Sequence, residues 1–164
     1  MLIWALYVLL RPVGRSLALL AVLMRLVEVA IHYVAMVFSL GALMLLSGAE
    51  YLTPFEPGQL HSLARVALST QGAGLNLGFV LLGLGSAVFA YLLLRASYVP
   101  RALAAWGVFS SLLLTTSAIT VILFPAVGPF VLATMIPMFL YEVALGFWLL
   151  LKGAKTRSSP ASAA

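Results

Sequence analysis

The sequence predicts an all-α, polytopic bundle of transmembrane helices, and its composition and hydropathy carry this prediction. Of the 164 residues, 64% are hydrophobic and only 8% are charged, whereas soluble domains average about 45–50% apolar and about 25% charged residues. Four apolar segments each reach the roughly 20 residues that a helix needs to cross a bilayer. Because no water in the hydrocarbon core can satisfy backbone polar groups, such segments must be helical. We expect a single domain over residues 1–152, with four full spans, a partial first span and a short interfacial helix.

The start of the chain is the expected partial span, since it is apolar from the first residue. A helix over residues 1–10 reaches about 15 Å, which is half of a hydrocarbon core. The segment has neither the basic region nor the cleavage site of a signal peptide. We interpret it as a half-span, or as the end of a longer span whose beginning is missing.

Four full spans follow, and their expected boundaries are about residues 16–46, 72–94, 102–124 and 130–151. The first of them would be roughly 46 Å long, so it must tilt in the bilayer or project beyond it. Residues 153–164 are rich in serine and alanine, and we expect a disordered cytoplasmic tail there.

A short helix is expected on the membrane surface between the first two full spans. Thr53 and Glu56 have the spacing of a capping box, and Pro57 suits the first position of a helix. Apolar residues then recur at helical spacing, namely Leu60, Leu63, Ala64 and Ala67. This pattern predicts a separate helix that lies on the outer face of the membrane.

The distribution of cations predicts the orientation of the bundle. Two loops and the C-terminal segment contain most of them: Arg11, Arg15, Arg95, Arg101, Lys152, Lys155 and Arg157. Cytoplasmic segments carry an excess of lysine and arginine, so these three segments are expected inside the cell. We expect a multi-pass protein of the inner (plasma) membrane with a cytoplasmic C-terminus.

Four ionisable residues inside the predicted spans form the candidate functional site. Arg25, Glu28 and His32 are three and four residues apart, so they share one face of a helix. Glu142 lies about 15 Å from the cationic end of its own span, and Arg25 has a similar depth. An unpaired charge at that depth is costly, so we expect Arg25 and Glu142 to approach each other.

Three interpretations of these four residues stay open, and the third is a site for a polar ligand. In the first, they serve transport or another proton-linked role, because histidine titrates near neutral pH and a carboxyl group removed from water can hold a proton. In the second, the charges only hold helices together, and the protein is a non-catalytic one that binds a partner or lipid. A cavity that reaches Glu142 would favour the first interpretation, and a fully packed interior would favour the second.

The sequence indicates no catalytic residues, no metal and no cofactor. It contains no cysteine and none of the common hydrolase, zinc-protease or nucleotide-binding motifs. An intramembrane enzyme is therefore the least favoured alternative. Because the positions of the cations are explained by membrane topology, we expect no binding of nucleic acid. The expected partner is the lipid bilayer, and a second copy or another membrane protein is left open.

The span at residues 72–94 is rich in glycine. Gly74 and Gly78 have the GxxxG spacing that lets two helices approach closely. Gly83 and Gly85 extend the same run of small residues. We expect all four glycines to pack against neighbouring helices.

Several segments resemble a family of bacterial membrane proteins, the domain of unknown function 4386. The similar segments are Ala5–Val13, Arg25–Glu28, Tyr91–Leu103 and the segment from Glu142 to Gly153. Within the third of them, the loop residues that carry the resemblance are Arg95, Ser97, Pro100 and Arg101. The resemblance implies a multi-spanning membrane protein and brings no established activity. Because family members carry a further N-terminal helix and part of another, it also implies that the beginning of this chain is missing.

Overall fold

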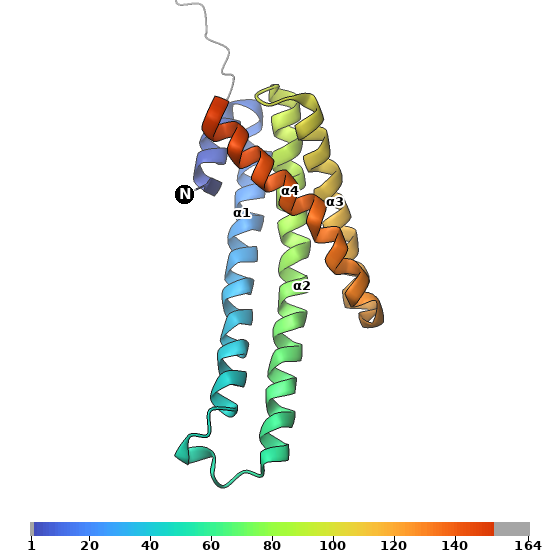
Figure 1. Cartoon of the computed structure of the whole chain (residues 1–164). Helices are drawn as coiled ribbons and strands as arrows, with labels where there is room; N and C mark the ends of the chain where they lie inside the picture. Colours follow the sequence, from blue (N-terminus) through green and yellow to red (C-terminus); the bar gives the residue numbers. More distant parts are fainter. Residues whose placement is uncertain (1, 153–164) are drawn as a thin grey trace, which may run out of the picture.

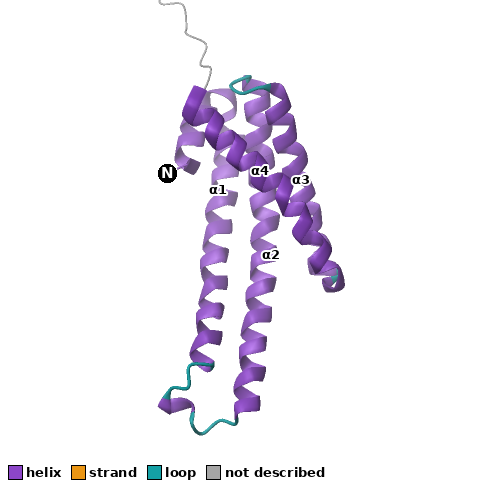
Figure 2. Cartoon of the chain, in the orientation of Figure 1, coloured by secondary structure: helices purple, strands orange, loops and turns teal. Residues whose placement is uncertain are grey.

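The computed structural model describes residues 2–152, and its regular structure is helical throughout that range (Figures 1 and 2). The α-helices are α1 (Leu2–Leu45), α2 (Pro57–Ala96), α3 (Arg101–Leu123) and α4 (Gly128–Lys152). Short 3-10 turns at Glu50–Leu52 and Pro125–Val127 lie in two of the connections. The all-α prediction is confirmed, and all four helices are long and apolar enough to cross a membrane. The expected disordered tail at residues 153–164 lies outside the described residues.

Helix α1 consists of two arms that meet at Gly14, where the backbone leaves the helical region (φ −173°, ψ 87°). Pro12, two residues earlier, has no N–H to give to the helical ladder, which favours a break at this point. The N-terminal arm, residues 2–13, folds back beside the start of the long arm, residues 15–45 (Figure 1). The bend therefore separates the segment expected as a partial span from the segment expected as the first full span.

The expected surface helix after Pro57 is not a separate element, and this prediction was wrong. Helix α2 runs without a break from Pro57 to Ala96, so the apolar pattern that follows Pro57 belongs to the same helix as the glycine-rich span. The capping box is also shifted by three residues, because Glu56 is the N-cap and its partner is Gln59. Both parts of this helix pack against the rest of the molecule. Ala64 in the first part is buried, and Gly74 in the glycine-rich part lies against α1.

The long arm of α1 and α2 form a hairpin, and α3 and α4 cover only one half of it (Figure 1). Helix α2 has 40 residues and is about 60 Å long, whereas α3 has 23 residues and is about 35 Å long. Helix α4 crosses α3 obliquely and ends beside the N-terminal arm (Figure 1). The bend in α1, the α2–α3 loop and the end of α4 share one end of the bundle, which we call the cationic end.

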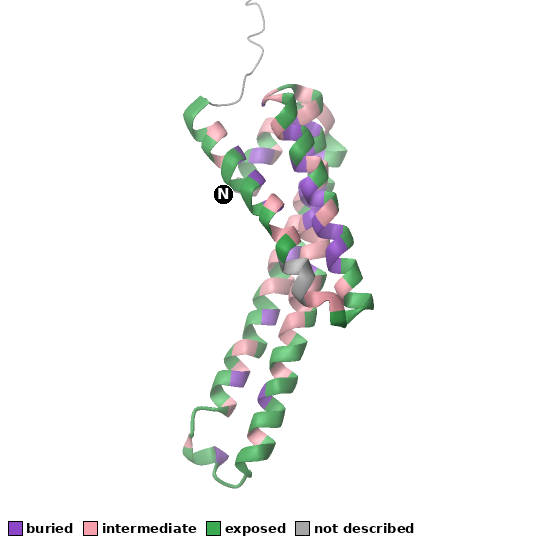
Figure 3. Ribbon diagram, turned by 45° about the vertical axis from the view of Figure 1, so that its right-hand side comes forward, coloured by how far each residue is buried: buried purple, intermediate pink, exposed green. Residues whose placement is uncertain are grey.

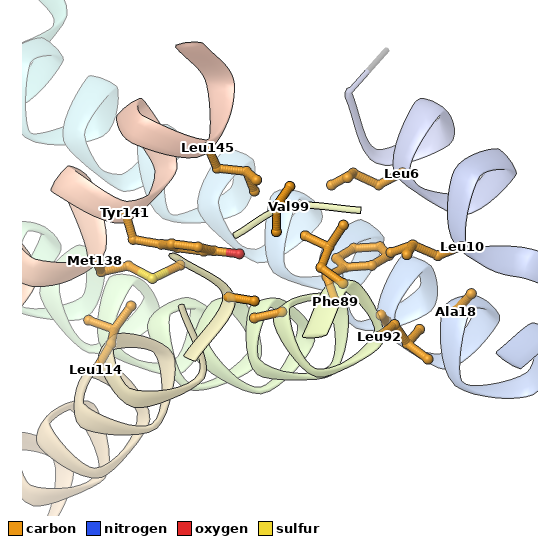
Figure 4. Packing of buried hydrophobic residues seen from close by; sticks show 14 residues of the cluster. Leu6, Leu10, Ala18, Phe89, Leu92, Val99, Leu114, Met138, Tyr141 and Leu145 are labelled. Carbon is orange, nitrogen blue, oxygen red and sulfur yellow. The ribbon is translucent and has the colours of Figure 1, made fainter. Parts of the chain in front are cut away.

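The buried core lies in the half of the molecule that α3 and α4 cover (Figure 3). Leu6 and Leu10 of the N-terminal arm lie near Phe89 of α2 in this core (Figure 4). On the other side of the core, Met138 and Tyr141 of α4 are buried, each 3% exposed. The core therefore joins the N-terminal arm to α4 through α2.

Candidate functional site

Arg25, Glu28 and His32 lie on the face of the long arm that contacts α2. Small side chains on the same helix are fully or almost fully buried: Ala18, Ala21, Ala35 and Ala42. They let the two helices approach closely, as small residues do in membrane bundles. Together with Glu142 of α4, these three residues form what we call the polar cluster.

Two glycines of α2 make room for side chains of the polar cluster. A Cβ atom on Gly85 would lie 3.2 Å from Cγ of Arg25, so the arginine stem crosses directly over this glycine. A Cβ atom on Gly78 would lie 2.7 Å from Cδ2 of His32, inside the space of the imidazole ring. The ring also meets Phe79 edge-on, with the ring centroids 5.4 Å apart. Close packing on α2 thus holds Arg25 and His32 in place.

The two other glycines that the sequence singles out face different helices. A Cβ atom on Gly74 would lie 3.1 Å from Cβ of Ala35, so Gly74 packs against α1. A Cβ atom on Gly83 would lie 2.7 Å from the carbonyl oxygen of Ser111, so Gly83 packs against α3. Glycines therefore line both interfaces of α2.

Glu28 is the centre of the polar cluster. Its side chain is only 7% exposed, and its Oε1 atom lies 2.7 Å from Nδ1 of His32, which is hydrogen-bonding distance. Its Oε2 atom lies 3.4 Å from Nη1 of Arg25. Neither of these last two atoms makes a hydrogen bond within the described part of the chain, so charge alone holds them together.

Glu142 reaches the polar cluster from α4, but it is held more loosely. Its Oε1 atom lies 4.0 Å from Nη2 of Arg25, and its side chain is 47% exposed. Arg25 therefore lies between two carboxylates, close to the buried Glu28 and further from the half-exposed Glu142. The structure brings all four residues together, in the order His32, Glu28, Arg25, Glu142.

Contacts between α3 and α4 fix the position of Glu142. The indole N–H of Trp106 donates a hydrogen bond to the carbonyl oxygen of Pro137, with a donor–acceptor distance of 3.2 Å. The hydroxyl of Ser111 lies 3.6 Å from Sδ of Met138. The ring of Tyr141 occupies the space above Gly107, where a Cβ atom would collide with it. Helix α4 is thus anchored on α3 immediately before and beside Glu142.

A cavity of about 110 Å³ opens beside Arg25 and Glu142. Ser86 and Tyr141 contribute the remaining polar side chains of its wall, and the rest of the wall is apolar. Neither Ser86 nor Tyr141 was predicted to belong to the site. The sequence offers one signal for each residue. Ser86 directly follows Gly85 of the glycine-rich span, and Tyr141 directly precedes Glu142. A cavity that reaches Glu142 favours the interpretation in which the polar cluster serves transport or another proton-linked role.

The loop residues that carry the family resemblance shape the α2–α3 connection. Arg95 lies in the last turn of α2, where a cation interacts favourably with the helix dipole. Ser97 is the C-cap of α2 and has a left-handed backbone conformation (φ 55°). Pro100 is the N-cap of α3, and Arg101 is its first residue. These four residues lie at the cationic end and not in the polar cluster.

Comparison with known proteins gives a family but no function. A family model described as "Domain of unknown function (DUF4386)" matches residues 1–153. No curated protein and no solved structure matches the chain. Within the part of the chain that the structure describes, no group of three or more His, Cys, Asp or Glu side chains could hold a metal ion.

Proposed function

Because the chain belongs to the family described as Domain of unknown function (DUF4386), whose description names no activity, we propose a function from the geometry of the polar cluster. The protein is an integral membrane protein, and its polar cluster binds and releases one proton as part of a transport or other proton-linked process. One observation carries this proposal: a single arginine lies between two carboxylates, and the buried carboxylate also contacts a histidine.

Counting charges shows why one proton belongs to the cluster. Arginine keeps its charge in proteins, so Arg25 can balance only one of the two carboxylates, Glu28 and Glu142. With a neutral His32, the cluster then carries one excess negative charge. An uncompensated charge inside a membrane is costly. One bound proton, on His32 or on Glu142, makes the cluster neutral.

The two proton positions lie at opposite ends of the cluster. His32 contacts Glu28, at the end nearer to the middle of the long hairpin. Glu142 lies at the cavity, and the charged groups that face it are Arg25 and Glu28 of α1. Its own helix adds the hydroxyl group of Tyr141, while the cavity-lining residues of α2 and of the N-terminal arm are uncharged. A proton that moves from His32 to Glu142 therefore passes from one side of Arg25 to the other.

Vibrational spectroscopy of the reconstituted protein tests this charge count. In a His32→Asn variant the proton must lie on a carboxyl group, so we expect a protonated carboxyl band at neutral pH that the double variant His32→Asn/Glu142→Gln lacks. In a Glu142→Gln variant Arg25 and Glu28 already balance, so we expect His32 to be neutral, as read by nitrogen NMR of the imidazole. A Glu50→Gln variant, which removes an exposed carboxylate outside the cluster, should behave like the wild type. An ionised Glu142 at neutral pH in the His32→Asn variant would contradict the proposal.

A second candidate function is purely structural, and one observation favours it. The charges of Arg25, Glu28 and His32 can compensate one another within α1, and the side chains of Arg25 and His32 pack over Gly85 and Gly78 of α2. In that case Glu142→Gln should leave the proton permeability of protein-containing vesicles unchanged. The proton-linked function instead requires that vesicles with the Glu142→Gln variant conduct protons more slowly than vesicles with the Glu50→Gln variant.

We also propose that the cationic end faces the cytoplasm of the cell, with the protein in its inner (plasma) membrane. The supporting observation is that Arg11, Arg15, Arg95, Arg101 and Lys152 gather at that end, as the positive-inside rule requires of cytoplasmic segments. A phosphatase that works only in the periplasm should be inactive when fused after Lys152. The same phosphatase inserted at Gly48, in the connection between α1 and α2, should be active. An active fusion after Lys152 together with an inactive insertion at Gly48 would contradict the proposed orientation.

A further inference from the structure

We propose that the cavity beside Glu142 binds a small organic cation with an apolar body, whose charged nitrogen takes the place of the proton at Glu142. This inference rests on the proposed function, because it assigns a ligand to the same carboxylate. Three properties of the cavity carry it: its size, its walls and the sign of its charge.

The cavity is partly open, and its size limits the part of a ligand that it can hold to about one ring. Its volume is about 110 Å³, somewhat below the roughly 150 Å³ of an engineered apolar cavity that binds benzene. Four segments enclose it, namely the N-terminal arm, the long arm of α1, α2 and α4. A ligand in this place would contact the N-terminal arm and α4 at the same time.

The walls of the cavity divide into an apolar part and a charged part. Leu6 of the N-terminal arm, Phe89 of α2 and Leu145 of α4 belong to the apolar part, and Arg25 and Glu142 form the charged part. Binding sites for small molecules commonly have this character, with mostly apolar walls and a few polar groups that orient the ligand. The ligand must therefore have an apolar body and a single polar end.

The charges select a cation for that polar end. Arg25 is already engaged by the buried Glu28 at 3.4 Å, whereas the half-exposed Glu142 has only the guanidinium, at 4.0 Å, as a cationic neighbour among the described residues. A ligand anion would add a third negative charge beside a single arginine. A monovalent cation neutralises the excess negative charge of the cluster as a proton does. The aromatic rings of Phe89 and Tyr141 in the same wall also favour a cation.

Cation and proton exclude each other at Glu142, because both neutralise the same charge. When an organic ammonium ion binds, the carboxyl proton leaves to the solvent, and Glu142 becomes the carboxylate partner of the ammonium group. One positive charge enters and one leaves, so the cluster stays neutral. The protein would therefore exchange one organic cation for one proton.

Calorimetry with benzylamine, which is an ammonium ion at neutral pH, tests this inference on the full chain in nanodiscs of phosphatidylcholine. We expect saturable binding to the wild type and to Glu50→Gln. Glu142→Gln should weaken binding at least about tenfold, as expected for a lost charge-assisted contact. Repeating the titration in buffers of different ionisation enthalpy counts the protons released. Benzoate, which has the same ring and the opposite charge, should bind neither to the wild type nor to either of the two variants.

A second variant blocks the cavity without touching a charge. A Cβ atom on Gly146, which lines the cavity, would meet no atom within 4 Å, so Gly146→Leu can extend into the cavity without straining α4. We expect this variant to lose benzylamine binding and to keep the carboxyl band of Glu142 in the His32→Asn background. Equal binding of benzoate, or unchanged benzylamine binding in Glu142→Gln, would overturn the cation site. A carboxyl band without any benzylamine binding would overturn the ligand and leave the proton function standing.

Discussion

Arg25→Met is expected to lower the free energy of unfolding by about 3–5 kcal/mol, the cost of removing one partner from a buried ion pair. The substitution keeps most of the apolar stem that crosses Gly85, so the loss reports mainly on charge. It leaves Glu28, whose side chain is 7% exposed, without its permanent cation and with only His32 beside it. Reversible unfolding in mixed detergent micelles measures the change. Arg65→Met, at an exposed arginine near the far end of α2, is the matched control and should have little effect.

Double-mutant cycles then decide which carboxylate depends on Arg25. The pairing of Arg25 and Glu142 that their depths predict occurs in the structure only at 4.0 Å, while Glu28 lies at 3.4 Å. We therefore expect the coupling energy of Arg25→Met with Glu28→Gln to exceed that of Arg25→Met with Glu142→Gln. Strictly additive losses for both pairs would mean that Arg25 balances neither carboxylate.

Gly83→Ala should be the most damaging small substitution in α2. Its new Cβ atom would lie 2.7 Å from the carbonyl oxygen of Ser111 and would also overlap the hydroxyl group of Thr115. Because a backbone carbonyl group cannot rotate away, α2 and α3 must separate. Overpacking of this kind costs typically about 1–3 kcal/mol. The thermal stability of the purified variant measures the effect.

Gly72→Ala is the matched control for Gly83→Ala. It lies in the same helix, and its added methyl group would meet no atom within 4 Å. Replacing a helical glycine with alanine is then expected to be neutral or to stabilise by up to about 1 kcal/mol. Equal losses at Gly72 and Gly83 would show that helix propensity, and not the α2–α3 contact, governs both positions.

Sequence and structure agree best where a property depends only on neighbouring residues. The bend at Gly14 follows a proline and separates two apolar segments, and both features are visible in the sequence. A helix start at Pro57 was predicted for the same local reason, although the helix was expected to be a separate one on the membrane surface. The continuity of α2 was missed because the polar and small residues after Pro57 read as a surface segment. In the structure the helix continues from these residues to the glycines, and Gly74 packs against Ala35 of α1.

The sequence by itself determined that the chain is a bundle of membrane helices and that Arg25, Glu28 and His32 share one face. Hydropathy and helical period are local properties, so no tertiary information is needed for either. Only the tertiary structure decided that Glu28 is the closer partner of Arg25, that Glu142 stays half exposed, and that a cavity lies beside it. These features depend on how the helices rotate and cross. Lipid is as apolar as the side chains, so hydrophobicity cannot set that rotation, and close packing at glycines sets it instead.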